Sequence, residues 1–123
     1  MLIDASSILV QIVDITIGDD GDPCGSIVVP PIEIDRPVRI IWRLPTKSGY
    51  LFSAAGVGGL AGPDFGESRF DDFGRRLFGW TARRPGSAAL RNYSIAIEWV
   101  DDDGVLQTCS TGVSPSLRII NRS

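Results

Sequence analysis

The chain of 123 residues contains no histidine, one lysine and two cysteines. Without imidazole it cannot form Ser-His-Asp or Cys-His nucleophile pairs, imidazole zinc or copper sites, or haem sites with a proximal histidine. Two thiols alone cannot supply a four-thiolate zinc site. The sequence also lacks an uninterrupted apolar run of about 18 residues, so no membrane-spanning helix is expected. These absences exclude many enzyme and metal classes.

Basic residues are also fewer than acidic residues. Twelve Lys and Arg stand against 15 Asp and Glu, for a net charge of −3 and an isoelectric point near 4.8. Duplex-binding proteins gain affinity by neutralising phosphates, so nucleic acid is not the expected partner. No basic residue precedes the first apolar run, and Asp4 and Asp14 interrupt it, which does not fit a signal peptide. We therefore expect one cytoplasmic domain over residues 1–123.

The two cysteines, Cys24 and Cys109, lie far apart in the sequence. A bridge between them would close a loop of about 86 residues, worth on the order of 4 to 5 kcal/mol by chain entropy. Such a bond does not persist in a reducing cytosol. We expect two thiols, one in a loop and one on a strand, with a disulfide as the alternative.

Most of the chain alternates apolar and polar residues with a period of two, which predicts β-strands. The clearest strands are 38–44 and 93–100, and further strands are expected at 8–17, 27–34, 50–55, 105–110 and 116–121. The segment 8–17 is largely apolar on both faces, which predicts a strand covered on both sides or one that lies deep in a sandwich. Pro30 and Pro31 place the strand 27–34 at a sheet edge or a bulge. About seven strands with Asp- and Gly-rich turns predict an all-β, antiparallel, immunoglobulin-like β-sandwich.

Residues 56–91 match no strand pattern cleanly and are expected to form one long Gly-, Phe- and Arg-rich insertion or lid. Phe70, Phe73 and Leu77 have the spacing of one side of a short helix. A structureless loop of this length is uncommon in a compact domain, so a binding element is one interpretation. Its aromatic residues either plug one end of the sandwich as core or remain exposed as an interaction patch.

Arginines gather in the same segment and alternate with its aromatic residues. Guanidinium groups bind carboxylates and phosphates bidentately and stack on rings, which suits an acidic protein partner or another copy of the chain. Alternatively, these arginines are solvated or paired locally with Asp64, Glu67, Asp71 and Asp72, and single-stranded nucleic acid is a third interpretation. The candidate partner-binding residues are Phe70, Phe73, Arg75, Arg76, Phe78, Trp80, Arg83 and Arg84.

Two acidic turns could hold a hard cation such as calcium. They contain Asp19, Asp20 and Asp22 in one turn and Asp101, Asp102 and Asp103 in the other. Asp is also favoured in turns for conformational reasons alone, so no metal or other cofactor is expected. The sequence has no G-x-S-x-G elbow and no phosphate-binding Gly-Lys-Ser/Thr, which makes an enzyme the weaker hypothesis.

Two local patterns resemble known families. Ala89-Leu90-Arg91-Asn92-Tyr93 resembles the tyrosine corner of immunoglobulin-like domains, with Ile95 in the place of the second cysteine. The segment from Tyr93 through Asp101-Asp102-Asp103-Gly104 to Pro115-Ser116-Leu117-Arg118-Ile119-Ile120-Asn121 is similar to the C-terminal pattern of small bacterial inclusion-body family proteins and their DP-EP relatives. This resemblance implies a non-enzymatic, self-associating sandwich.

Together these features predict a binding or self-assembly module that acts through protein–protein contacts, with the chain itself as a partner and no membrane. Partners would dock on residues 56–91 or add to the edge marked by Pro30 and Pro31. The alternative is a calcium-dependent, carbohydrate-binding module that uses the acidic turns.

Overall fold

A computed structural model describes residues 9–18, 23–45, 49–83, 89–111 and 115–120. Regular structure in these residues is β-strand apart from one turn of 3-10 helix, η2 (Cys24–Ser26). The strands are β1 (Leu9–Asp14), β2 (Thr16–Ile17), β3 (Ile27–Val28), β4 (Ile32–Ile34), β5 (Val38–Arg43), β6 (Leu51–Gly58), β7 (Phe65–Phe70), β8 (Leu77–Ala82), β9 (Ala89–Asn92), β10 (Ser94–Val100), β11 (Leu106–Ser110) and β12 (Ser116–Ile119).

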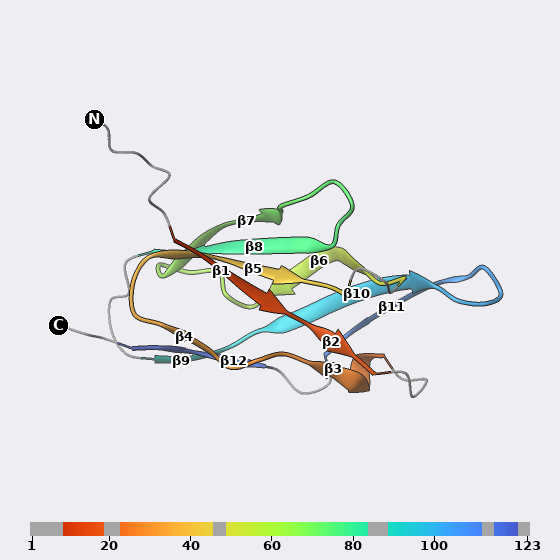
Figure 1. Cartoon of the computed structure of the whole chain (residues 1–123), viewed down its shortest axis with the longest axis horizontal. Helices are drawn as coiled ribbons and strands as arrows, with labels where there is room; N and C mark the ends of the chain where they lie inside the picture. The colour runs from red at the N-terminus through yellow and green to blue at the C-terminus, as the bar shows by residue number, and fades with distance from the viewer. Residues whose placement is uncertain (1–8, 19–22, 46–48, 84–88, 112–114, 121–123) are drawn as a thin grey trace.

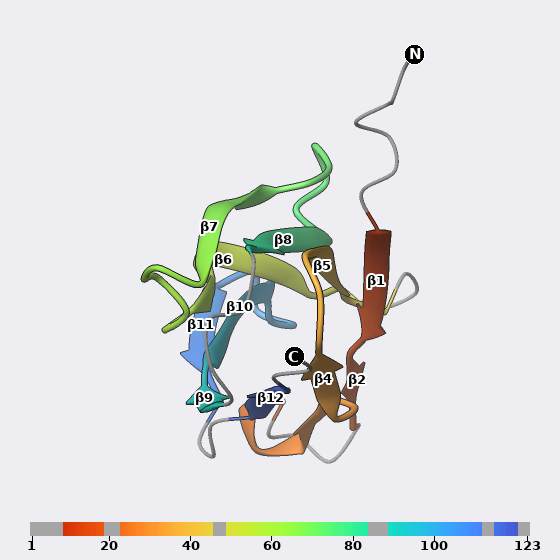
Figure 2. The same cartoon turned by 90° about the vertical axis from the view of Figure 1, so that its left-hand side faces the viewer.

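The strands form layers around one core. A four-stranded sheet has the order β1-β5-β8-β7, and the other sheets have the orders β11-β10-β6, β4-β12-β9 and β2-β3. Figure 1 shows the four-stranded sheet above β4, β9 and β12, with β10 running diagonally between them. Seen from the end, the sheets enclose the core (Figure 2). The all-β sandwich predicted from the period-two pattern is confirmed.

Alternation along the central strands produces the core. In β5, Val38, Ile40 and Trp42 face inward and are buried, while Arg43 is exposed. In β10, Ile95 and Ile97 are fully buried. Trp42 packs edge-on against Tyr93, with their ring centroids 5.3 Å apart, and its indole N–H donates a hydrogen bond to the Tyr93 hydroxyl. Burial raises the pKa of Tyr93 above its ordinary value.

Strand pairing differs from the expected antiparallel arrangement at two places. β1 pairs with β5 in parallel, and β4 pairs with β12 in parallel. The structure has more and shorter strands than the seven expected. Pro30 and Pro31 explain one division, because they separate β3 from β4 and lack the amide hydrogens that a continuous ladder needs. β4 then lies at a sheet edge, as predicted.

The segment 56–91 is not a long insertion, and the expected short helix is wrong. It contributes the end of β6, all of β7 and β8, and the start of β9. Phe70 ends β7, Phe73 lies in the turn, and Leu77 begins β8. β8 is the inner neighbour of β5 in the four-stranded sheet. Its inward side chains Phe78 and Trp80 complete the core, which is why the segment carries so many aromatic residues.

The prediction for residues 8–17 is also wrong. β1 lies at the margin of the four-stranded sheet, where Figure 2 shows it at the right-hand side of the molecule. Val13 and Ile15 are buried, whereas Leu9, Val10 and Ile12 are 49%, 56% and 44% exposed. The strand is apolar on both faces, but only one face is covered.

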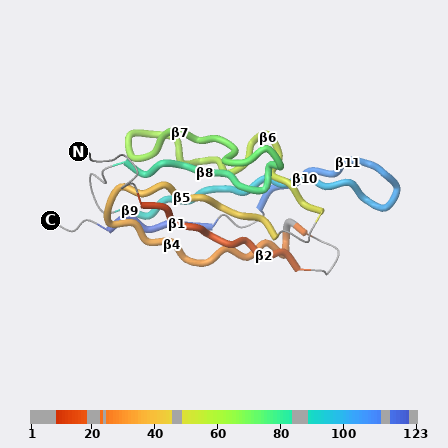
Figure 3. Tube along the Cα trace, turned by 45° about the horizontal axis from the view of Figure 1, so that its top comes forward, coloured from red at the N-terminus to blue at the C-terminus, as the bar shows by residue number. Residues whose placement is uncertain are grey.

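The hairpin between β10 and β11 extends from one end of the molecule, as the tube in Figure 3 shows. Gly104, with φ of +80°, supplies the left-handed turn residue predicted from Asp102-Asp103-Gly104. Among the described residues, no helix is long and apolar enough to cross a membrane.

Candidate functional site

The outer face of the four-stranded sheet carries both charged groups and exposed apolar groups. The register aligns Ile12 of β1 with Ile41 of β5, Ile41 with Gly79 of β8, and Gly79 with Arg69 of β7. A second row begins with Val10 and Arg39, and a third with Asp14 and Arg43. On this outer face β1 contributes Val10 and Ile12 in two of the rows and a carboxylate, Asp14, in the third, whereas β7 contributes Arg69.

A buried ion pair lies at the centre of the outer face. The Arg39 guanidinium binds the Asp71 carboxylate through Nε and Nη2, at distances of 2.9 to 3.2 Å. Its Nη1 donates to the Glu67 carbonyl oxygen at 2.6 Å and to the Thr81 hydroxyl at 2.9 Å. The Arg39 side chain is 9% exposed and that of Asp71 13%. Since both guanidinium forks are engaged, Arg39 acts as a fixed structural cation.

Gly79 makes room for this pair. A Cβ at Gly79 would lie 2.6 Å from Nη2 of Arg39 and would also collide with the Asp71 carboxylate. Glu67, whose carbonyl receives Arg39, has a φ of +56° and lies where the β7–β8 register shifts. A bulge at Glu67 thus turns a backbone carbonyl toward the guanidinium, at a cost in backbone strain.

A surface depression of about 720 Å³ adjoins the Arg39–Asp71 pair. Ile41, Arg69, Phe70 and Phe73 line it together with the pair. Arg69 reaches Asp71 through Nε at 3.2 Å, so the carboxylate binds two guanidinium groups. Phe73 is 108% exposed, in the turn between β7 and β8. The depression therefore combines internally neutralised charges with one ring that is open to solvent.

The predicted partner-binding residues separate into core and surface. Phe78 and Trp80 are buried, and the Trp80 indole N–H donates to the Val57 carbonyl oxygen at 2.6 Å. Phe70 is half-buried and packs edge-on against Phe78. Of the predicted phenylalanines, Phe73 alone points fully to solvent. The core interpretation is right for most of these rings, and the exposed-patch interpretation holds for Phe73.

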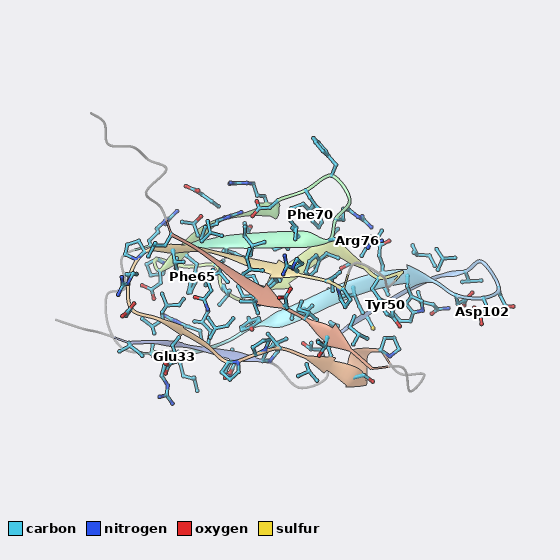
Figure 4. The ribbon with its side chains drawn as sticks, viewed as in Figure 1. Glu33, Tyr50, Phe65, Phe70, Arg76 and Asp102 are labelled. Atoms are coloured by element: carbon cyan, nitrogen blue, oxygen red, sulfur yellow. The ribbon has the colours of Figure 1, made fainter. Side chains whose placement is uncertain are left out.

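The predicted arginines are likewise not one patch. Arg75 binds the Glu98 carboxylate at 2.6 Å and lies 5.9 Å from the centroid of the Phe70 ring, so it is paired within the chain but not with one of the local acids. Arg76 lies in the turn between β7 and β8, labelled in Figure 4, and its amide donates to the Asp72 carboxylate at 3.0 Å. Arg83 is exposed beside Gly66, and Arg84 lies outside the described residues. The pairing partner of Arg75, Glu98, was not among the acids expected from the sequence.

Sequence reasoning missed Val10, Ile12, Arg39 and Asp71 as members of one surface. Arg39 occupies an outward position in a strand, where a solvated charge is the ordinary expectation. The sequence contained one signal of the Arg39–Asp71 pair. Gly79 stands between larger residues in its strand, and a glycine inside a strand often marks a place where another group approaches closely. The exposure of β1 depends on strand order, which the alternation pattern does not specify.

The acidic turns are only partly described. Asp19, Asp20 and Asp22 lie outside the described residues. The Asp101 carboxylate accepts hydrogen bonds from the Asp103 and Val105 amides, each at 2.9 Å, and from the Gln107 side chain at 2.8 Å. Asp102 lies at the tip of the hairpin (Figure 4). Across the part of the chain that the structure describes, no group of three acidic, cysteine or histidine side chains could hold a metal ion.

Cys109 on β11 is disulfide-bonded, so the expectation of a free thiol on this strand is wrong. The only other cysteine in the sequence is Cys24, for which the structure describes the backbone alone. In the comparison with known proteins, no family model matches this chain, and no curated protein matches its sequence.

Proposed function

We propose that the chain is a non-enzymatic module that acts through protein–protein contacts on the outer face of the four-stranded sheet, with a second copy of itself as a partner. The observation that carries the proposal is the exposure of Val10 and Ile12 on a marginal strand. Side chains of this size gain about 1.5 to 3 kcal/mol each on full burial, which favours covering them with another protein surface.

The charged groups of the same face support a binding role over catalysis. Arg39, Asp71 and Arg69 bind one another, and Asp14 pairs with Arg43 through two hydrogen bonds of 2.6 and 3.0 Å. The Arg43 guanidinium lowers the pKa of the Asp14 carboxyl below its ordinary value. Charged side chains that are paired with one another in this way stabilise the outer face and are not available as catalytic groups. The C-terminal resemblance to inclusion-body family proteins, with their immunoglobulin-like fold, points to the same function.

Native mass across a concentration series tests self-association directly. Static light scattering should give a mass that rises from 13.3 kDa toward twice that value as the protein is concentrated. A mass that stays at 13.3 kDa up to millimolar concentration would rule out the chain as its own partner.

The depression forms the second region of the proposed contact face, because Phe73 lies in it with its ring exposed. A Phe73→Ser substitution should change the free energy of unfolding by no more than about 0.5 kcal/mol, as for other surface positions. A larger loss in a denaturant titration would mean that the ring packs against the chain in solution. In that case the depression would not be part of the proposed contact face.

The alternative function is a calcium-dependent, carbohydrate-binding module, which is tested in parallel with self-association. It predicts a melting temperature that rises with added calcium and falls with a chelator, because binding to the folded state stabilises it. Three of the four ligand positions that Asp101 could offer are already used within its own turn. We expect no shift with either reagent.

The compartment forms a further part of the proposal. The sequence suggests the cytoplasm, whereas a disulfide at Cys109 persists in oxidising compartments. Mass spectrometry of alkylated protein isolated from its own cells distinguishes these. An unmodified Cys109 indicates an oxidising compartment, and an alkylated one indicates the cytoplasm.

A further inference from the structure

The sheet margins differ in how well they are protected against pairing with another strand. β7 carries Glu67 and Arg69 with a bulge, β4 follows two prolines and contains Glu33, and Arg91 of β9 is held by Asp64 at 2.8 Å. Charges, bulges and prolines are the usual means by which edge strands avoid association. β1 has none of these before Asp14, and its sequence, Leu-Val-Gln-Ile-Val-Asp, is more apolar than that of β11, an edge strand that also lacks them (Leu-Gln-Thr-Cys-Ser).

The backbone of β1 also has hydrogen-bonding groups directed away from the sheet. The Ile15 amide donates to the Arg43 carbonyl oxygen at 2.9 Å, so the odd-numbered residues of this segment face β5. Successive residues of a strand direct their amide and carbonyl groups to opposite sides. Those of Val10 and Ile12 therefore face the open margin. In the described part of the chain, no strand pairs with that margin.

We propose that β1 pairs antiparallel with β1 of a second copy across a two-fold axis at Gln11, joining two four-stranded sheets into one continuous sheet. This inference rests on the proposed function and specifies how the self-association is made. It places Val10 opposite the partner's Ile12, and Ile12 opposite the partner's Val10. Each pair exchanges both of its N–H···O bonds, through the groups that face the open margin.

Self-complementarity selects this register. The pairing brings together the two exposed apolar side chains of the outer face of β1, Val10 and Ile12, as cross-strand pairs. On the other face it places Leu9 against the partner's Val13. Moving the axis to Ile12 would instead put Val10 opposite the partner's Asp14, a carboxylate already committed to Arg43. Within residues 9–13, the axis at Gln11 places each of the three exposed apolar residues of β1 opposite an apolar residue of the partner.

A cross-linking experiment tests the register. At the axis, Gln11 faces the partner's Gln11 as a non-hydrogen-bonded pair, with Cα atoms about 4.5 Å apart. That separation lies within the range of about 4.4 to 6.8 Å that a disulfide spans. Under mild oxidation, a Gln11→Cys protein should become a covalent dimer. An Ile12→Cys protein is the matched control and should remain uncrosslinked, because its opposite residue is Val10.

A charge experiment tests the edge itself. A protein with Val10→Lys and Ile12→Lys places lysine opposite lysine and should remain monomeric at concentrations where the wild type dimerises. The matched control, Val28→Lys with Val100→Lys, has the same added charge at two side chains that are 62% exposed, and should still dimerise. Circular dichroism melting establishes that each variant is folded.

The results separate this inference from the proposed function. A wild type that stays monomeric overturns both. A dimer that survives the Val10→Lys, Ile12→Lys substitution overturns pairing through β1 and leaves self-association standing. Cross-linking of Ile12→Cys in preference to Gln11→Cys overturns the register. If the double-lysine protein is unfolded, the cysteine pair alone decides, because covalent dimer at Gln11 and not at Ile12 requires this pairing.

Discussion

At the scale of single residues, burial and pairing decide which charges matter. Arg39 and Asp71 form a nearly enclosed pair with further hydrogen bonds to Glu67 and Thr81. The ion pair of Arg118 with Glu33, by contrast, has both side chains exposed. Charges removed from water must be matched by partners, whereas exposed pairs contribute little.

Removing the Asp71 carboxylate should therefore be costly. An Asp71→Ala substitution leaves the Arg39 guanidinium buried beside Gly79 without its counter-charge, and should lower the free energy of unfolding by about 3 kcal/mol or more. Glu33→Ala, in the exposed Arg118–Glu33 pair, is the control, with an expected change below about 1 kcal/mol. Denaturant titration measures both. Equal losses in the two variants would show that the Arg39–Asp71 pair is as weak as a surface pair.

At the scale of elements, hydrogen bonds within a turn stabilise the two strands that the turn joins. The β10–β11 hairpin is an example, because the Asp101 carboxylate accepts from two amides of the turn and from Gln107. Hydrogen bonds to the charged form lower the pKa of Asp101 below its usual 3.8, with the Val105 amide the largest contributor.

The hairpin should consequently loosen in acid. Because the pKa of Asp101 is lower in the folded state than in the unfolded state, its contribution to stability is present above pH 3.8 and is lost as the pH falls through the folded-state value. Nuclear magnetic resonance should show the Asp101 carboxyl titrating below 3.8, with the Val105 amide shift following the same midpoint. Asp101→Asn should speed exchange of that amide, and Asp102→Asn should not. A midpoint at or above 3.8 would contradict this account.

At the scale of the whole molecule, strands distant in sequence are held together by packing around Trp42 and Tyr93, and the disulfide at Cys109 adds a covalent link. A covalent link restricts the unfolded chain and so raises the free energy of unfolding. The same whole-molecule arrangement leaves β1 at a margin, although its sequence is as apolar as that of a central strand.

Loss of the disulfide should destabilise the folded chain. Cys109→Ser, or reduction of the wild type, should lower the free energy of unfolding by about 2 to 5 kcal/mol. Ser110→Ala, at the exposed neighbouring position, is the control and should change it little. Urea titrations with and without reductant measure the effect. A wild type whose midpoint does not move on reduction would show that the link contributes nothing to stability.

The sequence by itself determined the fold class, because alternation of apolar and polar residues is a local property of strands. It predicted strands over 38–44 and 93–100, where Ile40, Trp42, Ile95 and Ile97 are buried, and an edge or bulge at Pro30 and Pro31. The tertiary structure decided what lies beside each strand. Alternation specifies two faces but not the neighbours of an edge, so it could not show that Phe78 is core while Phe73 is exposed. Nor could it show that Arg39 meets Asp71 over Gly79, or that one face of β1 is left uncovered, since each depends on strand order and register.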